Sequence, residues 1–229
     1  MLFFTLKKSK LTKYHYLKEP QIVSKQNIKV IEVPFEVSTE RLKDVFAILY
    51  KTYYKTKGVP KVKGFPISKA RYSNPIDKDL NSDNREEIFK NIVWKGSASI
   101  EIPDHIKNLP KGLEKDRLTA RINTWNYGEI VEILHIGPYE DEQPTIKKLM
   151  NHVEQQGYVI NGPHEEEYLR GPGTPFAKQK NYYTIIRYQV KKVRIKSFKN
   201  LAERYGNKNA KKEVERTQET AQKKQNKGQ

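Results

Sequence analysis

The segment from Gly128 to Val190 constrains the fold most, because its turn residues separate four elements in a defined order. A short strand ends in HIGPY (135–139), and an acidic turn and an amphipathic helix follow it. The third element contains EEEYL (165–169), and the fourth runs from Tyr182 to Val190. Gly-Pro pairs, which mark turns, stand at three of the junctions. The pattern predicts a strand, a helix and two further strands.

The third element places an acid and an aromatic residue two positions apart. Side chains alternate between the faces of a strand, so Glu166 and Tyr168 should point the same way. Glu165 and Glu167 should then share the opposite face. A carboxylate beside an aromatic ring on one face is suited to a pocket for a small molecule.

The same order of elements recurs more faintly in the first half of the chain. Strands are expected at 28–34, 67–72 and 91–102, and a helix at 39–57 with apolar residues at three-and-four spacing. A unit of this size cannot bury its own apolar face, so two units should pack together as one domain. The chain is therefore predicted to be an α+β protein built on an internal repeat with pseudo-twofold symmetry.

These motifs carry a resemblance to a known family. GPYEDE (137–142), the pair Gly162-Pro163, Glu166-x-Tyr168-Leu169 and Thr184-x-x-Arg187 resemble the GyrI-like (gyrase-inhibitor-like) effector-binding domains. The resemblance is close from about residue 129 to 190 and weaker over 28–102. It implies duplicated strand-helix-strand-strand units that form an antiparallel sheet, with the helices on one face and a ligand groove on the other. Family members bind small compounds that are often cationic or aromatic.

One position departs from many members of the family. They carry an acidic residue directly after the threonine of the last strand, where this chain has Ile185. The chain resembles a branch of the family in which this position is apolar and an arginine, Arg187, ends the motif. Glu166 is therefore the acidic candidate that remains.

The candidate ligand-binding residues combine this acid with aromatic side chains. Tyr168 and Tyr72 occupy equivalent positions of the two repeats and should face each other across the pseudo-twofold axis. Aromatic walls suit flat or cationic ligands, although tyrosine and tryptophan are also ordinary residues of sheets and cores. The full candidate set is Glu166, Tyr168, Tyr72, Trp94, Trp125 and Tyr139.

Binding without catalysis is the favoured function, and two alternatives stay open. One is a hydrolase of reactive small electrophiles with Glu166 as general base. The other is an interaction module that acts through basic residues on nucleic acid or a membrane surface. No cofactor and no metal site is expected, because His15, His105, His152 and His164 show no metal-ligand spacing. The fifth histidine, His135, is expected to hydrogen-bond structurally at a strand end.

The charge of +17 is concentrated at the C-terminus and suggests three regions. Residues 191–229 carry 13 Lys/Arg against 4 Asp/Glu, and apolar residues nearly vanish after Tyr205. We therefore expect a basic tail over 193–229 that is disordered or helical. A basic N-terminal extension (1–27) precedes a single domain over 28–192, which divides into repeat one (28–102), a linker (103–120) and repeat two (121–192).

The expected partner is a small-molecule ligand. No pattern of a sequence-specific nucleic-acid reader is present, so the tail predicts only weak non-specific binding to anionic partners. With 36% hydrophobic residues and no apolar run of about 20, the chain is expected to be cytoplasmic. The apolar start MLFF, followed by lysines, leaves a membrane tether through a missing N-terminal anchor as the alternative.

Overall fold

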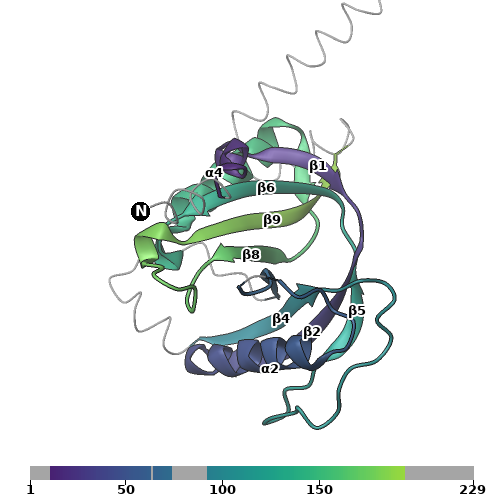
Figure 1. The fold of residues 1–229 in the computed structure, drawn as a ribbon. Helices are drawn as coiled ribbons and strands as arrows, with labels where there is room; N and C mark the ends of the chain where they lie inside the picture. Colours follow the sequence, from purple (N-terminus) through teal and green to yellow (C-terminus); the bar gives the residue numbers. More distant parts are fainter. Residues whose placement is uncertain (1–10, 63, 74–91, 194–229) are drawn as a thin grey trace, which may run out of the picture.

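The computed structural model describes residues 11–62, 64–73 and 92–193 of the chain (Figure 1). The expectations for the apolar start at 1–4 and for the basic tail from residue 194 on lie outside the described residues.

One antiparallel sheet organises the described part of the chain. Its order is β1-β6-β9-β8-β3-β4-β2-β5, and β7 pairs with β9. The strands are β1 (Gln21–Lys25), β2 (Ile28–Ser38), β3 (Ser68–Tyr72), β4 (Val93–Glu101), β5 (Arg121–Trp125), β6 (Gly128–Ile136), β7 (Tyr158–Ile160), β8 (His164–Arg170) and β9 (Tyr183–Lys192). The helices are α2 (Leu42–Lys55) and α4 (Gln143–Gln155), with short 3-10 turns η1 (His15–Lys18), η2 (Thr39–Arg41), η3 (Tyr139–Asp141) and η4 (Gln179–Asn181).

A bent two-stranded ribbon joins the two ends of this strand order. One strand of the ribbon is β1 continued by β2, and the other is β5 continued by β6. Both bend at the same place. The pairs Lys25–Gly128 and Ile28–Trp125 keep one register across the bend. The sheet is therefore strongly curled, with β1, β6, β9 and β8 on one side of the curl and β4, β2 and β5 on the other (Figure 1).

Within the described ranges each half of the sheet carries one helix, and both helices lie against the same face. Val45 and Leu49 of α2 pack with Ile31 of β2, and Leu149 of α4 packs with Ile133 of β6. We call this the helix face. Directly paired residues on it form the row Ala98, Ala70, Glu166, Ile186 and Ile133.

The opposite face carries ionisable side chains, and we call it the charged face. Directly paired residues on it form the row Ser97, Arg71, Glu165, Arg187 and Glu132.

The sequence explains where the second helix begins and ends. Pro144 stands in its first turn, where the missing N–H removes no helical hydrogen bond. Gly157 follows the helix with φ of +71°, a conformation that favours glycine, and its N–H donates to Glu154 O at 2.9 Å. The chain then turns into β7 and β8, which brings β8 to the centre of the sheet.

The α+β fold predicted from the sequence is confirmed, and the elements β2-α2-β3-β4 and β6-α4-β8-β9 follow the expected order. Two segments outside the expected repeats also take part in the fold. β1 lies inside the expected extension (1–27), so the sheet begins before residue 28. The expected linker (103–120) contributes Ile106 and Leu118 to the core beneath α2.

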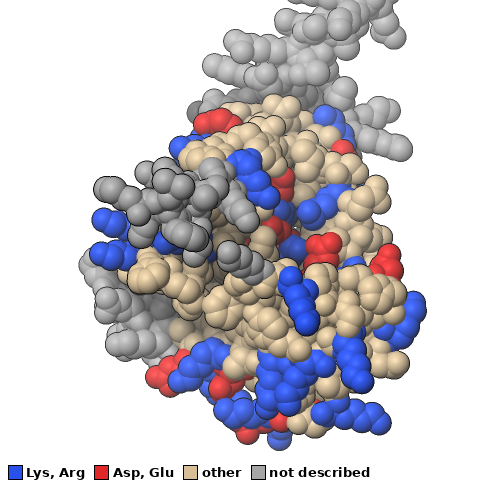
Figure 2. Space-filling view, viewed as in Figure 1, with Lys and Arg blue, Asp and Glu red and all other residues tan. Residues whose placement is uncertain are grey.

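Among the described residues, no helix is long and apolar enough to cross a membrane. Figure 2 shows acidic and basic side chains interspersed over this view of the molecule, with lysines and arginines gathered along the lower rim, around α2 and β5 of Figure 1.

Candidate functional site

Strand β8 divides its side chains between the two faces as the sequence predicts. Arg71 on β3 binds Glu165 through Nε and Oε2 at 2.8 Å, and Arg187 on β9 binds Glu167 through Nη1 and Oε2 at 2.7 Å. These contacts hold both glutamates on the charged face. Glu166 lies between them in sequence but opposite Ala70 and Ile186, on the helix face.

Aromatic rings surround Glu166 on the helix face. The hydroxyls of Tyr72 and Tyr168 lie 2.8 Å apart across β3 and β8, which confirms that the two equivalent tyrosines face each other. The ring of Tyr168 meets Phe46 of α2 and Tyr139 of η3 edge to face, and Trp94 of β4 packs on Tyr72. Five of the six predicted site residues are thus brought together between α2 and α4.

The predicted residues and the predicted face of the groove do not coincide. The groove was expected opposite the helices, but the five clustered residues lie on the helix face. The sixth, Trp125, lies on the charged face, where its Nε1–H donates to Glu32 Oε2 at 2.8 Å. The guanidinium of Arg71 stacks over Trp125 at 4.2 Å from the ring centroid. Trp125 therefore supports a buried ionic network and does not belong to the cluster.

Two residues that sequence reasoning did not select complete the cluster. His164 Nε2 lies 2.8 Å from Glu166 Oε1, and its Nδ1 lies 2.6 Å from the hydroxyl of Tyr188. Glu142, which directly precedes α4, is 4% exposed, and its Oε1 is buried without a hydrogen-bond partner. The i, i+2 spacing of His164 and Glu166 on a strand was a usable signal, whereas Glu142 comes from another element.

The cluster is negatively biased. Among the described residues, no ion pair joins Glu142 or Glu166 to a lysine or arginine. The only basic side chain paired with either of them there is His164, which contacts Glu166. Burial, and then the charge of Glu166, raises the pKa of Glu142 well above its usual value. A buried oxygen without a partner costs about 1–3 kcal/mol. The site therefore favours a group that brings positive charge.

The same burial and negative charge change the pKa values of the surrounding tyrosines. Burial is the largest cause and the charge of Glu166 the second in raising the pKa of each of four phenols, which keeps all of them protonated at neutral pH. They are Tyr72, Tyr139, Tyr168 and Tyr188. Neutral tyrosine rings beside carboxylates are the surroundings in which a cation gains both ionic and cation–π attraction.

His135, at the end of β6, has the structural role expected of it. Its Nδ1 lies 3.0 Å from Thr145 Oγ1 and its Nε2 lies 2.9 Å from Pro138 O. These bonds tie the end of β6 to the start of α4, so His135 positions the segment that carries Tyr139 and Glu142.

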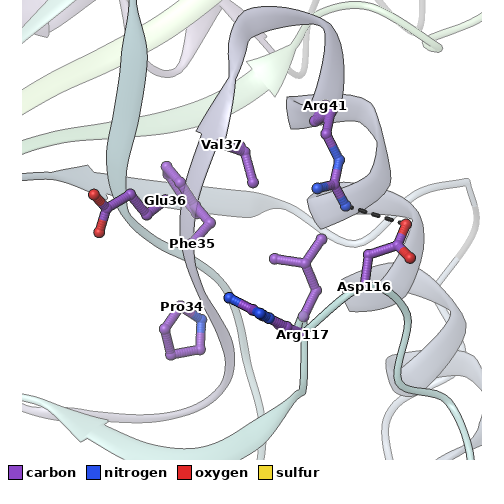
Figure 3. A pocket seen from close by; sticks show the side chains of 8 residues that line it. Pro34, Phe35, Glu36, Val37, Arg41, Asp116 and Arg117 are labelled. Atoms are coloured by element: carbon purple, nitrogen blue, oxygen red, sulfur yellow. Dashed lines mark hydrogen bonds and ion pairs between the residues drawn. The ribbon is translucent and has the colours of Figure 1, made fainter.

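A surface cavity of about 680 Å³ lies elsewhere, along the part of β2 that extends beyond β5. Apolar and charged side chains line it in equal number, and an ion pair of 3.2 Å joins Arg41 to Asp116 (Figure 3). The lining residues are Pro34, Phe35, Glu36, Val37, Arg41, Asp116, Arg117 and Leu118. None of the predicted site residues lines this cavity.

The described residues form an α+β domain: a curled antiparallel sheet with a helix over each half, and a buried group of aromatic and acidic side chains on the helix face. Residues 126–191 match the model of the family described as the GyrI-like small molecule binding domain. This match confirms the family resemblance predicted from the sequence for that part of the chain.

Solved structures share the fold over most of the chain. A hydrolase from Listeria innocua aligns with a TM-score of 0.54 and 16% identity, over 81% of this chain and 98% of that one. The C-terminal domain of EcmrR aligns with a TM-score of 0.51 and 16% identity, over 76% and 98%. EcmrR in a DNA complex aligns with a TM-score of 0.55 and 17% identity, over 83% of this chain and 64% of that one. These identities establish the fold alone. No curated protein sequence matches the chain.

Proposed function

We propose that the chain binds a small organic cation, or an aromatic compound with a cationic group, between α2 and α4. Glu166 is the counter-ion, and Tyr72, Tyr168 and Tyr139 form the aromatic wall. The observation that carries the proposal is the pair of buried carboxylates, Glu142 and Glu166, with no lysine or arginine bound to either among the described residues. A cationic ligand supplies the missing charge.

The proposal requires the cluster to open for its ligand. Glu166, Tyr72 and Trp94 are each less than a tenth exposed. The aromatic contacts on Tyr168, the neighbour of Glu166 on the same face, come from α2 and η3, which belong to different halves of the molecule. A small separation of these elements would expose the wall. Edge-to-face contacts between Tyr168 and its neighbours would then be exchanged for contacts with the ligand.

A thermal-shift screen against quaternary amines, cationic dyes and aromatic metabolites tests this function. A compound at about 100 times its dissociation constant should stabilise the fold by about 2.7 kcal/mol. Glu166→Gln should abolish the shift, because the amide keeps the shape and loses the charge. Glu36→Gln is the matched control, since Glu36 is an exposed strand glutamate paired with Lys95. Equal shifts in both variants would refute Glu166 as the counter-ion.

Hydrolysis is the second candidate, favoured by the contact between Glu166 and His164. A histidine 2.8 Å from a carboxylate can accept or return a proton. One neighbour in fold is described as a hydrolase. Product formation that is lost in Glu166→Gln while ligand affinity remains would favour catalysis. Loss of affinity without any turnover by the wild type would favour binding alone.

A further inference from the structure

Three side chains on the helix face have the composition and proximity of a metal site. Glu142, His164 and Glu166 each offer one ligand atom, and these three atoms lie within 4.8 Å of one another. His164 and Glu166 come from β8, whereas Glu142 precedes α4. A metal ion at their centre would tie the helix to the middle of the sheet.

Glu142 independently indicates that something binds at this position. It is 4% exposed, yet its Oε1 is buried and has no hydrogen-bond partner. Buried carboxylate oxygens are normally paired with a donor or a metal. Because no lysine or arginine of the described chain reaches Glu142, the fitting partner is a cation from outside the protein.

The contacts of His164 suit a metal ligand. Its Nδ1 lies 2.6 Å from the Tyr188 hydroxyl, and its Nε2 points at Glu166 Oε1. When Nδ1–H donates to Tyr188, the lone pair of Nε2 is available. Metal-binding histidines are commonly held in this way by a partner on the second ring nitrogen, which sets tautomer and ring orientation.

We propose that Glu142, His164 and Glu166 bind one divalent transition-metal ion. One imidazole and two carboxylates are typical ligands of Zn²⁺, Co²⁺, Mn²⁺ and Fe²⁺, whereas Ca²⁺ prefers six to eight oxygen ligands. Three protein ligands leave at least one coordination position open. Tyr168 lies two residues from Glu166 on β8, and Tyr139 packs against it, so the metal ion would occupy the proposed ligand site.

This inference uses Glu166 of the proposed ligand site but does not depend on any organic compound being bound. A metal ion and an organic cation neutralise the same two carboxylates, and they therefore compete. Binding of metal alone tests the inference separately from the proposed function.

The test is calorimetric titration of CoCl₂ and ZnCl₂ into chelator-treated full-length protein, together with metal analysis after desalting. We expect one ion per chain. Glu142→Gln and His164→Gln should each weaken binding at least tenfold, and His105→Gln, an exposed histidine away from the cluster, should leave it unchanged. The Co²⁺ complex should show visible absorption bands that both cluster variants lose.

Two results would overturn the inference: no saturable binding near one ion per chain in the wild type, or equal binding in wild type and Glu142→Gln. Glu142→Gln keeps the test decisive if His164→Gln does not fold, because it removes an unpaired buried carboxylate and should fold normally. An organic cation that binds in the presence of chelator, without any metal binding, would leave the proposed function intact and remove the metal site. Metal binding without binding of any organic cation would support the metal site and refute the proposed function.

Discussion

Replacing Arg187 with methionine should destabilise the fold strongly, because three glutamates depend on this arginine. Arg187 is 4% exposed, and its Nε binds Glu132 Oε2 at 2.6 Å. Its Nη1 lies 2.7 Å from Glu167 and 3.4 Å from Glu165. Methionine fills a similar volume, so the change tests the lost charge more than a cavity.

The three glutamates are not equally dependent on Arg187. Glu165 keeps Arg71 at 2.8 Å and the Tyr127 hydroxyl at 2.9 Å, and Glu167 keeps Lys69 at 3.8 Å. Glu132 is 7% exposed, and its side chain has no other hydrogen bond or ion pair among the described residues. Leaving one buried charge without a partner costs about 3–5 kcal/mol. Arg187→Met should lower the free energy of unfolding by this amount at pH 7.

The loss of stability caused by Arg187→Met should become smaller as the pH falls. Burial raises the pKa of Glu167, but the charges of Arg187 and Lys69 outweigh it, so the pKa lies below the usual value. In the wild type, ionised Glu167 therefore contributes stability above about pH 4.5, and this stability is lost as the pH falls through its lowered pKa. Without Arg187, burial outweighs the remaining positive charge and raises the pKa of Glu167. The variant therefore loses stability as the pH rises. The difference between the proteins should therefore be larger at pH 7 than at pH 4.5.

Urea unfolding followed by tryptophan fluorescence and circular dichroism measures both effects. Glu132→Gln added to Arg187→Met should recover part of the loss, since it removes the charge left unpaired. Arg41→Met is the control: Arg41 is 41% exposed and pairs with Asp44 and Asp116, so about 0–1 kcal/mol is expected. A loss below 1 kcal/mol for Arg187→Met, or one that does not change with pH, would refute the reasoning.

Three further outcomes are expected. Gly96→Ala should lower the melting temperature sharply, because a Cβ there would meet the Arg71 carbonyl oxygen at 2.0 Å across two paired strands; an unchanged melting temperature would show that the strands can separate. Trp125→Phe should cost about 1–3 kcal/mol in urea unfolding, since Glu32 loses a buried donor, and should leave ligand-induced thermal shifts intact. Removing residues 200–229 should also preserve those shifts, and their loss would move the function to the tail.

The sequence alone determined the local geometry of β8 and the order of the main elements. Strand alternation is a property of the backbone, so the separation of Glu166 and Tyr168 from Glu165 and Glu167 follows wherever the strand lies. Equivalent positions in two repeats likewise place Tyr72 and Tyr168 on the same face of neighbouring strands, where their hydroxyls meet. These features depend on neighbours in sequence or on symmetry.

Only the tertiary structure decided which distant side chains join them. Trp125 falls on the charged face because β5 pairs with β2 through Ile28–Trp125, a register that spacing within β5 does not reveal. Glu142 reaches His164 and Glu166 because α4 packs on the half of the sheet next to β8. Register between strands and the docking of a helix are set by non-local packing of apolar surfaces, which no short sequence pattern encodes.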